Sequence, residues 1–432
     1  MSLKDRIEKR TARIGVIGLG YVGLPLAVEF ARAGFDVTGF DVDASKVAEV
    51  NAGRSYIGDV STTDVAAEVT AGKLRATTDM SLLRDIDAVD ICVPTPLRKT
   101  KDPDMSFVVA AAEQIAKYLH PGMLVVLEST TYPGTTAEVL QPLFEATGLK
   151  VGVDFYLAFS PERVDPANEK YTTRNTPKVI GGTTPACSEV AAALYATAID
   201  TMVPVSSTQV AEMVKLLENT FRAVNIGLVN EIALMSHRMN INVWEVIEAA
   251  STKPFGFMPF YPGPGLGGHC IPIDPFYLSW KARQSGFECR FIELAGQING
   301  SMPAFVVDRV SEALNTKKQA INGARVHIFG VAYKKDVSDM RESPALDVLE
   351  LLHRRGAVLS YTDPYVPALE LEYGGVSLTS VPESAAGPGI DCAVICTNHT
   401  AFDYSAMPGR FPLVVDTRNA LKGTSAANVF RL

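Results

Sequence analysis

Short apolar runs alternate with amphipathic segments through the first half of the chain. Runs of this length, bounded by turn-forming residues, predict buried strands. They lie at 13–17, 35–40, 88–93, 123–128 and 155–159. An apolar-faced helix over 24–33, closed by Gly34, follows the first run. Strands that alternate with helices indicate a parallel sheet, so we assign residues 1–205 to an α/β domain.

The pattern changes at Ser206, which together with Gln209 fits a capping box. Apolar residues then recur at helical spacing from Val210 onward, and they predict one long helix to about Asn240. A helix of this length can join two domains and offer a dimer surface. We therefore assign 206–321 to a central helical domain.

Lys215 and Asn219 lie four residues apart on this helix and therefore share a face. The default interpretation of such a lysine is a solvated surface residue. Asn219 is equally ambiguous, and neither residue alone indicates a site.

A second alternating region covers 322–432. Its predicted strands lie at 325–333, 357–362, 391–396 and 412–415. A helix over 343–355, closed by Gly356, separates the first two strands. The chain is thus predicted to be an α/β protein, with two Rossmann-like doubly wound domains joined by the helical domain.

A charged turn follows the first strand of this second domain. It contains Lys334, Lys335, Asp336 and Arg341. Positive charge at the carboxyl end of a strand suits a phosphate-bearing ligand. The alternative is an ordinary solvated loop.

A glycine-rich turn with the dinucleotide-binding spacing follows the first strand of the chain. Its members are Gly18, Gly20, Tyr21, Val22 and Gly23. Glycines there let a pyrophosphate approach the N-terminus of the next helix. Asp41 ends the second strand, where a carboxylate binds ribose hydroxyls and repels a 2′-phosphate. This context predicts NAD as cofactor.

Polar turns follow three further strands of the first domain. They contain Thr95, Thr130, and Glu162 with Arg163. Ligands bind beyond the carboxyl ends of parallel strands, so we expect these turns near the cofactor. Simple connecting loops are the alternative.

The segment 263–274 is a loop rich in glycine and proline that presents Cys270. A thiolate held in this way can attack a carbonyl carbon. The alternative is a purely structural role, a tight turn around a buried cysteine. Asp274, followed by Pro275, fits the start of a helix, a structural role that is compatible with catalysis.

Composition excludes several classes of function. The net charge of −8 over 432 residues disfavours a nucleic-acid surface. No segment predicts a membrane span, and residues 1–10 lack the apolar run of a secretory signal, so we expect a cytoplasmic protein. The six cysteines are scattered, three of them in apolar strands (Cys92, Cys392 and Cys396), and predict neither disulfides nor a metal site.

These motifs, in this order, resemble the UDP-glucose/GDP-mannose dehydrogenase family along nearly the whole chain. They are 18–23, 160–163, Lys215 with Asn219, 267–274, 332–336 and 339–344. The resemblance implies an NAD-binding domain, a central domain that forms a homodimer, and a C-terminal domain that holds UDP.

Within the family, the cysteine loop looks most like that of enzymes that oxidise UDP-N-acetylglucosamine. Relatives acting on UDP-glucose usually have serine in place of His269, to which we assign no catalytic role. They also have a second glutamate in place of Pro166, and whether Asp165 replaces that carboxylate is left open. The expected partner is therefore a UDP-N-acetylated sugar.

The resemblance also implies roles for individual residues. Cys270 would form a thiohemiacetal and then a thioester with the sugar C6, while Lys215 and Asn219 stabilise the oxyanion and Asp274 activates water. Thr130 and Glu162 would hold this water and the substrate. Further substrate contacts are implied for Arg163, Tyr261, Gly265, Gly267, Lys334 and Arg418. Arg341 would contact the NAD pyrophosphate, near Thr95 and Thr130.

Two rivals remain at this point. Sister enzymes that oxidise UDP-N-acetylmannosamine or the galacto epimer share the fold, the cysteine and the cofactor. A non-catalytic sensor of NAD or of a nucleotide sugar would keep the fold, since fold alone does not fix function.

Asp41 gives the first prediction. We expect kcat/KM to favour NAD over NADP by about 100-fold, because juxtaposed like charges cost several kcal/mol and about 1.4 kcal/mol is tenfold. Steady-state kinetics with both cofactors measures this ratio, and Asp41→Asn should narrow it. Equal values for the unmodified protein would show that the glycine turn has been misinterpreted.

Overall fold

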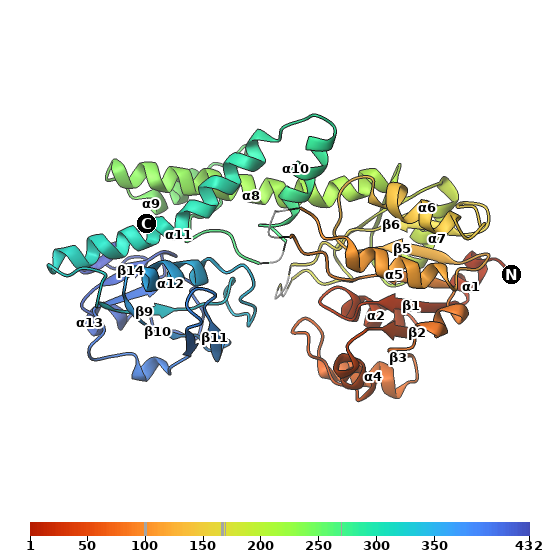
Figure 1. Ribbon diagram of the computed structural model, residues 1–432, viewed down its shortest axis with the longest axis horizontal. Helices are drawn as coiled ribbons and strands as arrows, with labels where there is room; N and C mark the ends of the chain where they lie inside the picture. The colour runs from red at the N-terminus through yellow and green to blue at the C-terminus, as the bar shows by residue number, and fades with distance from the viewer. Residues whose placement is uncertain (99–101, 166–167, 169, 269) are drawn as a thin grey trace. The chain divides into compact units, whose positions relative to one another are not determined.

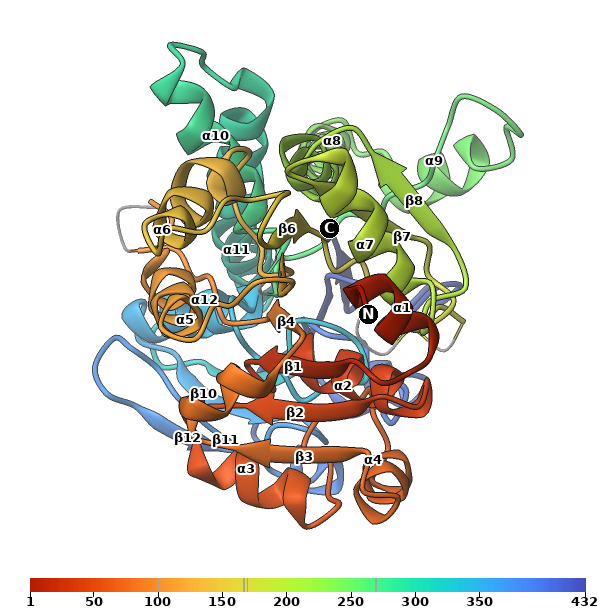
Figure 2. The ribbon, with the colours of Figure 1, turned by 90° about the vertical axis from the view of Figure 1, so that its right-hand side faces the viewer.

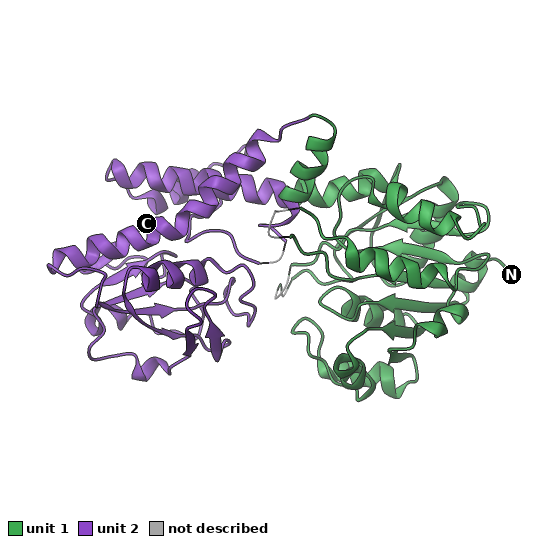
Figure 3. Ribbon diagram, in the orientation of Figure 1, with its two compact units in different colours: residues 1–218, 276–286 green, residues 219–275, 287–432 purple. Residues whose placement is uncertain are grey.

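The computed structural model describes residues 1–98, 102–165, 168, 170–268 and 270–432. They form two compact units (Figure 3). The first unit combines Met1–Glu218 with Phe276–Gly286, and the second combines Asn219–Pro275 with Phe287–Leu432. Two of the three boundaries fall inside helices, α8 (Thr208–Arg238) and α10 (Asp274–Gln284), and the third follows α10, between Gly286 and Phe287. The domain limits predicted at 205/206 and 321/322 remain predictions.

One sheet forms the centre of the first unit, with strand order β3-β2-β1-β4-β5-β6-β7-β8 (Figure 2). Its strands are β1 (Arg13–Ile17), β2 (Asp36–Phe40), β3 (Leu74–Thr77), β4 (Ala88–Ile91), β5 (Leu124–Leu127), β6 (Tyr156–Phe159), β7 (Lys178–Gly182) and β8 (Met202–Val205). Neighbouring strands are parallel, apart from β6 and β7, which are antiparallel.

The register of this sheet brings the strand ends level. Ile17 pairs with Phe40 on one side and with Ile91 on the other. Leu127 pairs in turn with Ile91 and with Phe159. The turns that follow β1, β2, β4, β5 and β6 therefore leave the sheet at one edge, as predicted.

Helices cover both faces of this sheet. The sheet alternates its side chains, so that Val126 joins the core under α2 and α7 while Val125 joins the core under α5 and α6. The helical segments of this unit, besides parts of α8 and α10, are α1 (Leu3–Glu8), α2 (Gly23–Arg32), α3 (Ala44–Asn51), α4 (Thr62–Thr70), η1 (Met80–Asp85), α5 (Ser106–Ala116), the π-helical η2 (Thr136–Leu140), α6 (Gln141–Glu145) and α7 (Pro185–Tyr195).

The second unit contains a parallel sheet in the order β10-β9-β13-β14-β15, and a separate antiparallel pair β11-β12. The strands are β9 (Arg325–Phe329), β10 (Val358–Thr362), β11 (Ala368–Glu370), β12 (Ser377–Thr379), β13 (Cys392–Ile395), β14 (Val414–Asp416) and β15 (Val429–Arg431). Its helical segments, besides parts of α8 and α10, are α9 (Val243–Ala250), α11 (Arg290–Thr316), α12 (Pro344–Arg354), η3 (Glu383–Ala385) and α13 (Met407–Arg410).

Two apolar cores lie against this second sheet. Val310 of α11 and Leu349 of α12 pack on β9 and β13 in one of them, and the two helices lie side by side (Figure 1). Phe329, Phe402 and Phe411 belong to the other core. The predicted fold is confirmed: two Rossmann-like α/β domains, with a long helix between them in the sequence.

The long helix α8 approaches α11 closely in the second unit. A Cβ added at Gly227 would come within 3.2 Å of Ala295, a tight contact that glycine avoids. The other side of α8 is exposed and apolar at Phe221, Leu228 and Met235, which are seven residues apart and therefore share a face.

Two local predictions were wrong. The cap of α8 is Ser207, whose hydroxyl accepts the Val210 N–H at 3.2 Å, and Ser206 precedes it. The strand predicted over 325–333 ends at Phe329, because Gly330 adopts φ +78° and turns the chain out of the sheet.

Among the described residues, none of the helices combines the length and the apolar character needed to cross a membrane.

Candidate functional site

The glycine turn of the first unit is shaped for an anion. Gly18 has φ +93°, and a Cβ at Gly23 would lie 1.8 Å from the Gly18 carbonyl oxygen, so neither position accepts a side chain. A Cβ at Gly20 would meet nothing within 4 Å, which leaves room beside the turn. Within the described residues no side chain caps the N-terminus of α2 at Val22. Its N–H groups therefore face the space that a pyrophosphate needs.

Asp41 follows β2 and is 6% exposed. Its two carboxylate oxygens accept the N–H groups of Leu19 at 2.8 Å and Asp43 at 2.9 Å, and Lys46 Nζ lies 3.7 Å away. These bonds fix the carboxylate beside the glycine turn, where ribose hydroxyls can donate to its remaining lone pairs. Turn and carboxylate together fit NAD. Tyr21 in the turn is 41% exposed.

Lys215 and Thr130 meet in the first unit. Lys215 Nζ donates to Thr130 Oγ1 at 2.6 Å, and the lysine is only 8% exposed. The alternative of a solvated surface lysine is therefore wrong. At the next turn along the edge, the Thr95 carbonyl accepts the Tyr277 hydroxyl at 2.9 Å.

Glu162 is held on all sides. One oxygen accepts Lys178 Nζ at 2.9 Å, and the other accepts the N–H groups of Arg163 at 2.7 Å and Val164 at 2.8 Å. Burial opposes ionisation of Glu162, but the Lys178 charge and these donors hold its pKa below the usual value. Arg163 turns its guanidinium to Glu218, at 2.5 Å.

Behind Glu162 lies a buried polar network that the sequence analysis missed. Lys178 is 3% exposed and also contacts Glu128 at 2.7 Å. The Tyr195 hydroxyl lies 2.5 Å from both Glu128 Oε1 and Asp90 Oδ1. One hydroxyl proton cannot serve two carboxylates at once, so this group must hold a further proton, and Asp90 is the candidate. Burial, with the charge of Glu128, raises its pKa to about 8. The sequence feature that could have indicated this network is an acidic residue within each of two apolar strands, Asp90 in 88–93 and Glu128 in 123–128.

In the second unit the cysteine loop packs on the charged turn after β9. Cβ atoms at Gly265 and Gly267 would come within 3.1 Å of Pro344 and 2.7 Å of Tyr333, respectively. The Gly268 N–H donates to the Arg341 carbonyl at 3.1 Å. These glycines therefore allow contact between two chain segments. His269 lies outside the described residues, as does Pro166.

Cys270 sits one turn before Asp274, at the start of α10. Its carbonyl accepts the Asp274 N–H at 2.8 Å, which fixes the distance between the two residues through the backbone. Asn219 Nδ2 donates to Asp274 Oδ2 at 2.6 Å, and Asp274 is 1% exposed. Cys270 itself is half-buried, whereas Cys92, Cys392 and Cys396 are buried as predicted.

The remaining predicted substrate residues of this unit lie around the same loop. Arg418 donates to the Cys396 carbonyl at 2.8 Å, and a Cβ at Gly263 would come within 2.6 Å of its guanidinium. Tyr261 is half-exposed, and its ring stacks on that of Trp244 with the two ring centroids 6.4 Å apart. Lys334 is half-buried in the charged turn, and Arg341 is exposed and pairs with Asp339 at 2.6 Å.

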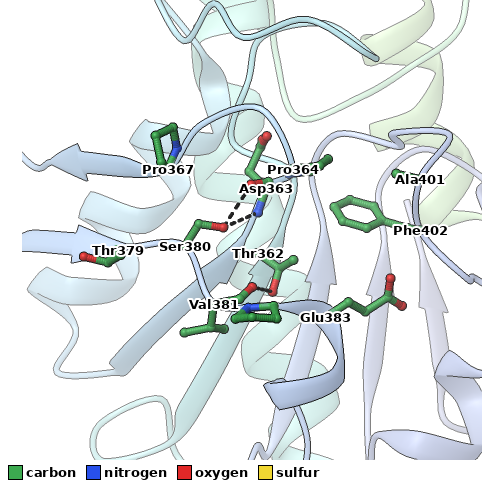
Figure 4. A pocket seen from close by; sticks show the side chains of 11 residues that line it. Thr362, Asp363, Pro364, Pro367, Thr379, Ser380, Val381, Glu383, Ala401 and Phe402 are labelled. Atoms are coloured by element: carbon green, nitrogen blue, oxygen red, sulfur yellow. Dashed lines mark hydrogen bonds between the residues drawn. The ribbon is translucent and has the colours of Figure 1, made fainter.

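A cavity of about 440 Å³ opens beside the end of β10, at the position that corresponds to Asp41 in the first unit (Figure 4). Asp363 stands there, but it accepts the N–H groups of Val331 at 2.7 Å and Ala332 at 3.0 Å, and contacts His399 Nε2 at 3.0 Å. The Asp363 carboxylate thus binds the backbone of the turn after β9.

Three family models cover the chain in succession. They describe the NAD-binding, central and UDP-binding domains of the UDP-glucose/GDP-mannose dehydrogenase family, and they match residues 12–199, 209–301 and 327–423. The chain belongs to this family.

Members of the family with different substrates are about equally similar to this chain. A UDP-N-acetyl-D-mannosamine dehydrogenase of Pyrococcus horikoshii is 37% identical over 97% of this chain and 98% of its own length. A UDP-N-acetyl-D-glucosamine 6-dehydrogenase of Pseudomonas aeruginosa is 37% identical over 88% and 90%. A solved structure of the P. horikoshii UDP-D-ManNAc dehydrogenase matches with a TM-score of 0.89 and 36% identity, over 97% of this chain and 98% of the other.

Family membership confirms the predicted NAD cofactor and the class of a nucleotide-sugar dehydrogenase with a UDP-binding domain. Among the described residues, no group of three or more His, Cys, Asp and Glu side chains is placed to hold a metal ion.

The network around Asp90 generates the second prediction. Its pKa is raised in the folded state, so its contribution to stability is complete below the unfolded pKa of about 4 and is lost as pH rises through about 8. Asp90→Asn cannot ionise. Its thermal midpoint should therefore fall less steeply between pH 5 and 9, as measured by differential scanning calorimetry.

Asp85→Asn, which removes a half-exposed carboxylate beside Arg13, is the matched control and should keep the normal slope. Parallel midpoint curves for Asp90→Asn and the unmodified protein would show that Asp90 is ionised in the fold.

Proposed function

We propose that this dehydrogenase oxidises the C6 alcohol of UDP-N-acetyl-D-glucosamine to the carboxylate, and that the reaction passes through a thioester on Cys270. The observation that carries the proposal is a half-buried thiol, Cys270, one turn before a carboxylate, Asp274. Asn219 Nδ2 donates to Asp274 Oδ2 at 2.6 Å and so fixes this carboxylate. A dehydrogenase that stopped at the aldehyde would need no such nucleophile.

The chemistry assigns each residue a task. NAD, when bound, accepts a hydride at each of the two oxidation steps. The Cys270 thiolate adds to the aldehyde carbon, and the resulting thiohemiacetal loses hydride to become a thioester. The Lys215 ammonium stabilises negative charge on the substrate oxygen. Asp274 takes a proton from the water that releases the acid. Asn219 orients Asp274 and keeps a second N–H for the substrate.

Glu162 has a positioning task in this proposal. Its oxygens are already occupied by Lys178 and two backbone N–H groups, and its lowered pKa makes it a poor proton donor. We propose that Glu162 fixes the turn after β6 and helps Thr130 to hold the water used in hydrolysis. Arg163, Tyr261, Gly265, Gly267, Lys334 and Arg418 are proposed to bind the UDP-sugar, while Arg341 and Thr95 are proposed to lie along NAD.

The choice of sugar rests on the resemblance of the cysteine loop, since relatives of both specificities are 37% identical to this chain. NADH formation with the UDP derivatives of N-acetylglucosamine, N-acetylmannosamine, N-acetylgalactosamine and glucose tests it. We expect the highest kcat/KM for the first. A preference for another sugar would overturn the substrate assignment, and NADH formation with none of them would favour the sensor.

Cys270→Ser tests the thioester and is the third prediction. Serine keeps the shape but is a far poorer nucleophile here, so formation of the uronic acid should fall by about 1,000-fold or more. Calorimetric binding of NAD and of the UDP-sugar should persist, because neither depends on the thiol. Near-normal double oxidation by the variant would eliminate covalent catalysis at Cys270.

We further propose that two copies of the chain associate through α8. Phe221, Leu228 and Met235 repeat every seven residues and are 47%, 53% and 48% exposed, and Phe291 at the start of α11 is 76% exposed. Such an apolar strip is long and regular enough to pack against its own copy.

The fourth prediction follows from this strip. Leu228→Glu should convert a dimer into a monomer in sedimentation equilibrium, because it places charge inside an apolar contact. Lys317→Glu, an exposed charge change at the far end of α11, is the control. An unmodified protein that sediments as a monomer would contradict the proposed dimer.

A further inference from the structure

Glu212 is a buried carboxylate to which the proposed reaction gives no task. It lies on α8, one turn before Lys215, and has no exposed surface. A carboxylate is taken out of water only where several donors replace the solvent. Its contacts therefore indicate what it holds.

In the described part of the chain, the donors to Glu212 come from one loop, the segment 130–136 after β5. Glu212 Oε2 accepts the Gly134 N–H at 2.6 Å. Glu212 Oε1 accepts the Thr136 N–H at 2.9 Å and the Thr136 hydroxyl at 2.7 Å. The carboxylate thus binds the end of the loop where η2 begins.

The start of the same loop is bound by Lys215, which donates to Thr130 Oγ1 at 2.6 Å. Two side chains one turn apart on a single helix therefore fasten both ends of one short loop. The interior of the loop is tight as well: Gly134 has φ +106°, and a Cβ there would come within 2.4 Å of Glu138 Oε1. The loop can move away from α8 only by breaking one of these two attachments.

We propose that Glu212 is a positioning residue that holds Thr130 against Lys215. The inference rests on the proposed function only in the tasks given to Thr130 and Lys215. A carboxylate that merely capped η2 would stabilise the fold without affecting Lys215.

The protonation of Glu212 separates these two roles. Burial, against the hydrogen bonds from Thr136 and Gly134, raises its pKa to about 7, and the charge of Glu138 adds to the shift. Lys281 pairs with Glu138 at 2.6 Å, and Lys215 lies one turn along α8. Protonation removes an acceptor, so the loop should loosen as pH falls below about 7. Because the folded-state pKa is raised, protonation at the same time favours the fold. Turnover and thermal stability should therefore change in opposite directions below neutral pH.

Glu212→Gln is the decisive variant, because its amide turns a donor toward N–H groups that need an acceptor. We expect kcat to fall about 10–100-fold, as for the loss of hydrogen bonds to a charged group, with KM for NAD nearly unchanged. The decline of kcat near pH 7 should disappear. Glu138→Gln, with the same change of charge on an exposed carboxylate of η2, should keep the plateau kcat and move the decline of kcat only slightly, to lower pH, because the Glu138 charge is the smallest contribution to the raised pKa of Glu212.

Hydrogen exchange read by mass spectrometry gives a measurement that needs no substrate. Peptides covering 129–138 should exchange faster in Glu212→Gln, and Lys215 should react faster with an amine-modifying reagent, while Glu138→Gln changes neither. If no UDP-sugar is oxidised, the proposed function fails but this measurement still decides whether Glu212 holds the loop.

Thr136→Val, which removes one donor and keeps the volume, covers the case in which Glu212→Gln does not fold, and should show a smaller change of the same kind. Normal kcat, a normal pH profile and normal exchange in the folded variant would overturn the proposal. So would a loss of stability with kcat and Lys215 reactivity unchanged, which would identify a simple helix cap.

Discussion

The ammonium of Lys178 is the charge around which the polar interior of the NAD-binding unit is arranged. It lies 2.7 Å from Glu128 and 2.9 Å from Glu162, and it is 3% exposed. Removing one partner from a buried pair typically costs about 3–5 kcal/mol, because the other charge stays uncompensated. The ion pair with Glu162 therefore does two things. It compensates the buried charge of Lys178, and it fixes Glu162 at the edge of the sheet. Asp90 and Glu128 share a single tyrosine hydroxyl, and burial raises the pKa of Asp90, which favours a neutral carboxyl there and limits the negative charge left beside Lys178.

The two Rossmann-like sheets use one position in different ways. Asp41 accepts two backbone N–H groups and stays beside an open glycine turn, where Gly20 leaves space. Asp363 occupies the corresponding place after β10, but it also contacts His399, and its turn is closed by contacts from Val331 and Ala332. Asp363 accepts four backbone N–H groups and contacts His399, so it has less capacity for ribose hydroxyls than Asp41, which accepts two. The second domain thus keeps the layered fold, and the proposed nucleotide contact at Lys334 lies in the charged turn after β9 instead.

Much of this arrangement was predictable because it is local in sequence. The glycine turn, Asp41 and the level strand ends follow from periodicity and from the behaviour of parallel sheets, and α8 follows from its apolar spacing. The network around Lys178 was not predictable, because Glu128 lies 50 residues from Lys178 and no periodicity links them. Glu212 escaped for the same reason, since its donors lie 76 and 78 residues away. The Ser206 cap failed because only Ser206 has Gln209 at capping-box spacing, whereas the helix begins one residue later and is capped by Ser207.

In the proposed reaction, the Cys270 thiol must stay aligned from its attack on the aldehyde through the second hydride transfer and the hydrolysis. Side-chain contacts alone would let such a nucleophile drift between steps. Here the Cys270 carbonyl is the first acceptor of α10, so the thiol and Asp274 are separated by one turn of hydrogen-bonded backbone. The loop before them is rich in glycine because it passes within contact distance of Tyr333 and Pro344. Its glycines therefore allow the close packing that holds this loop against the turn after β9.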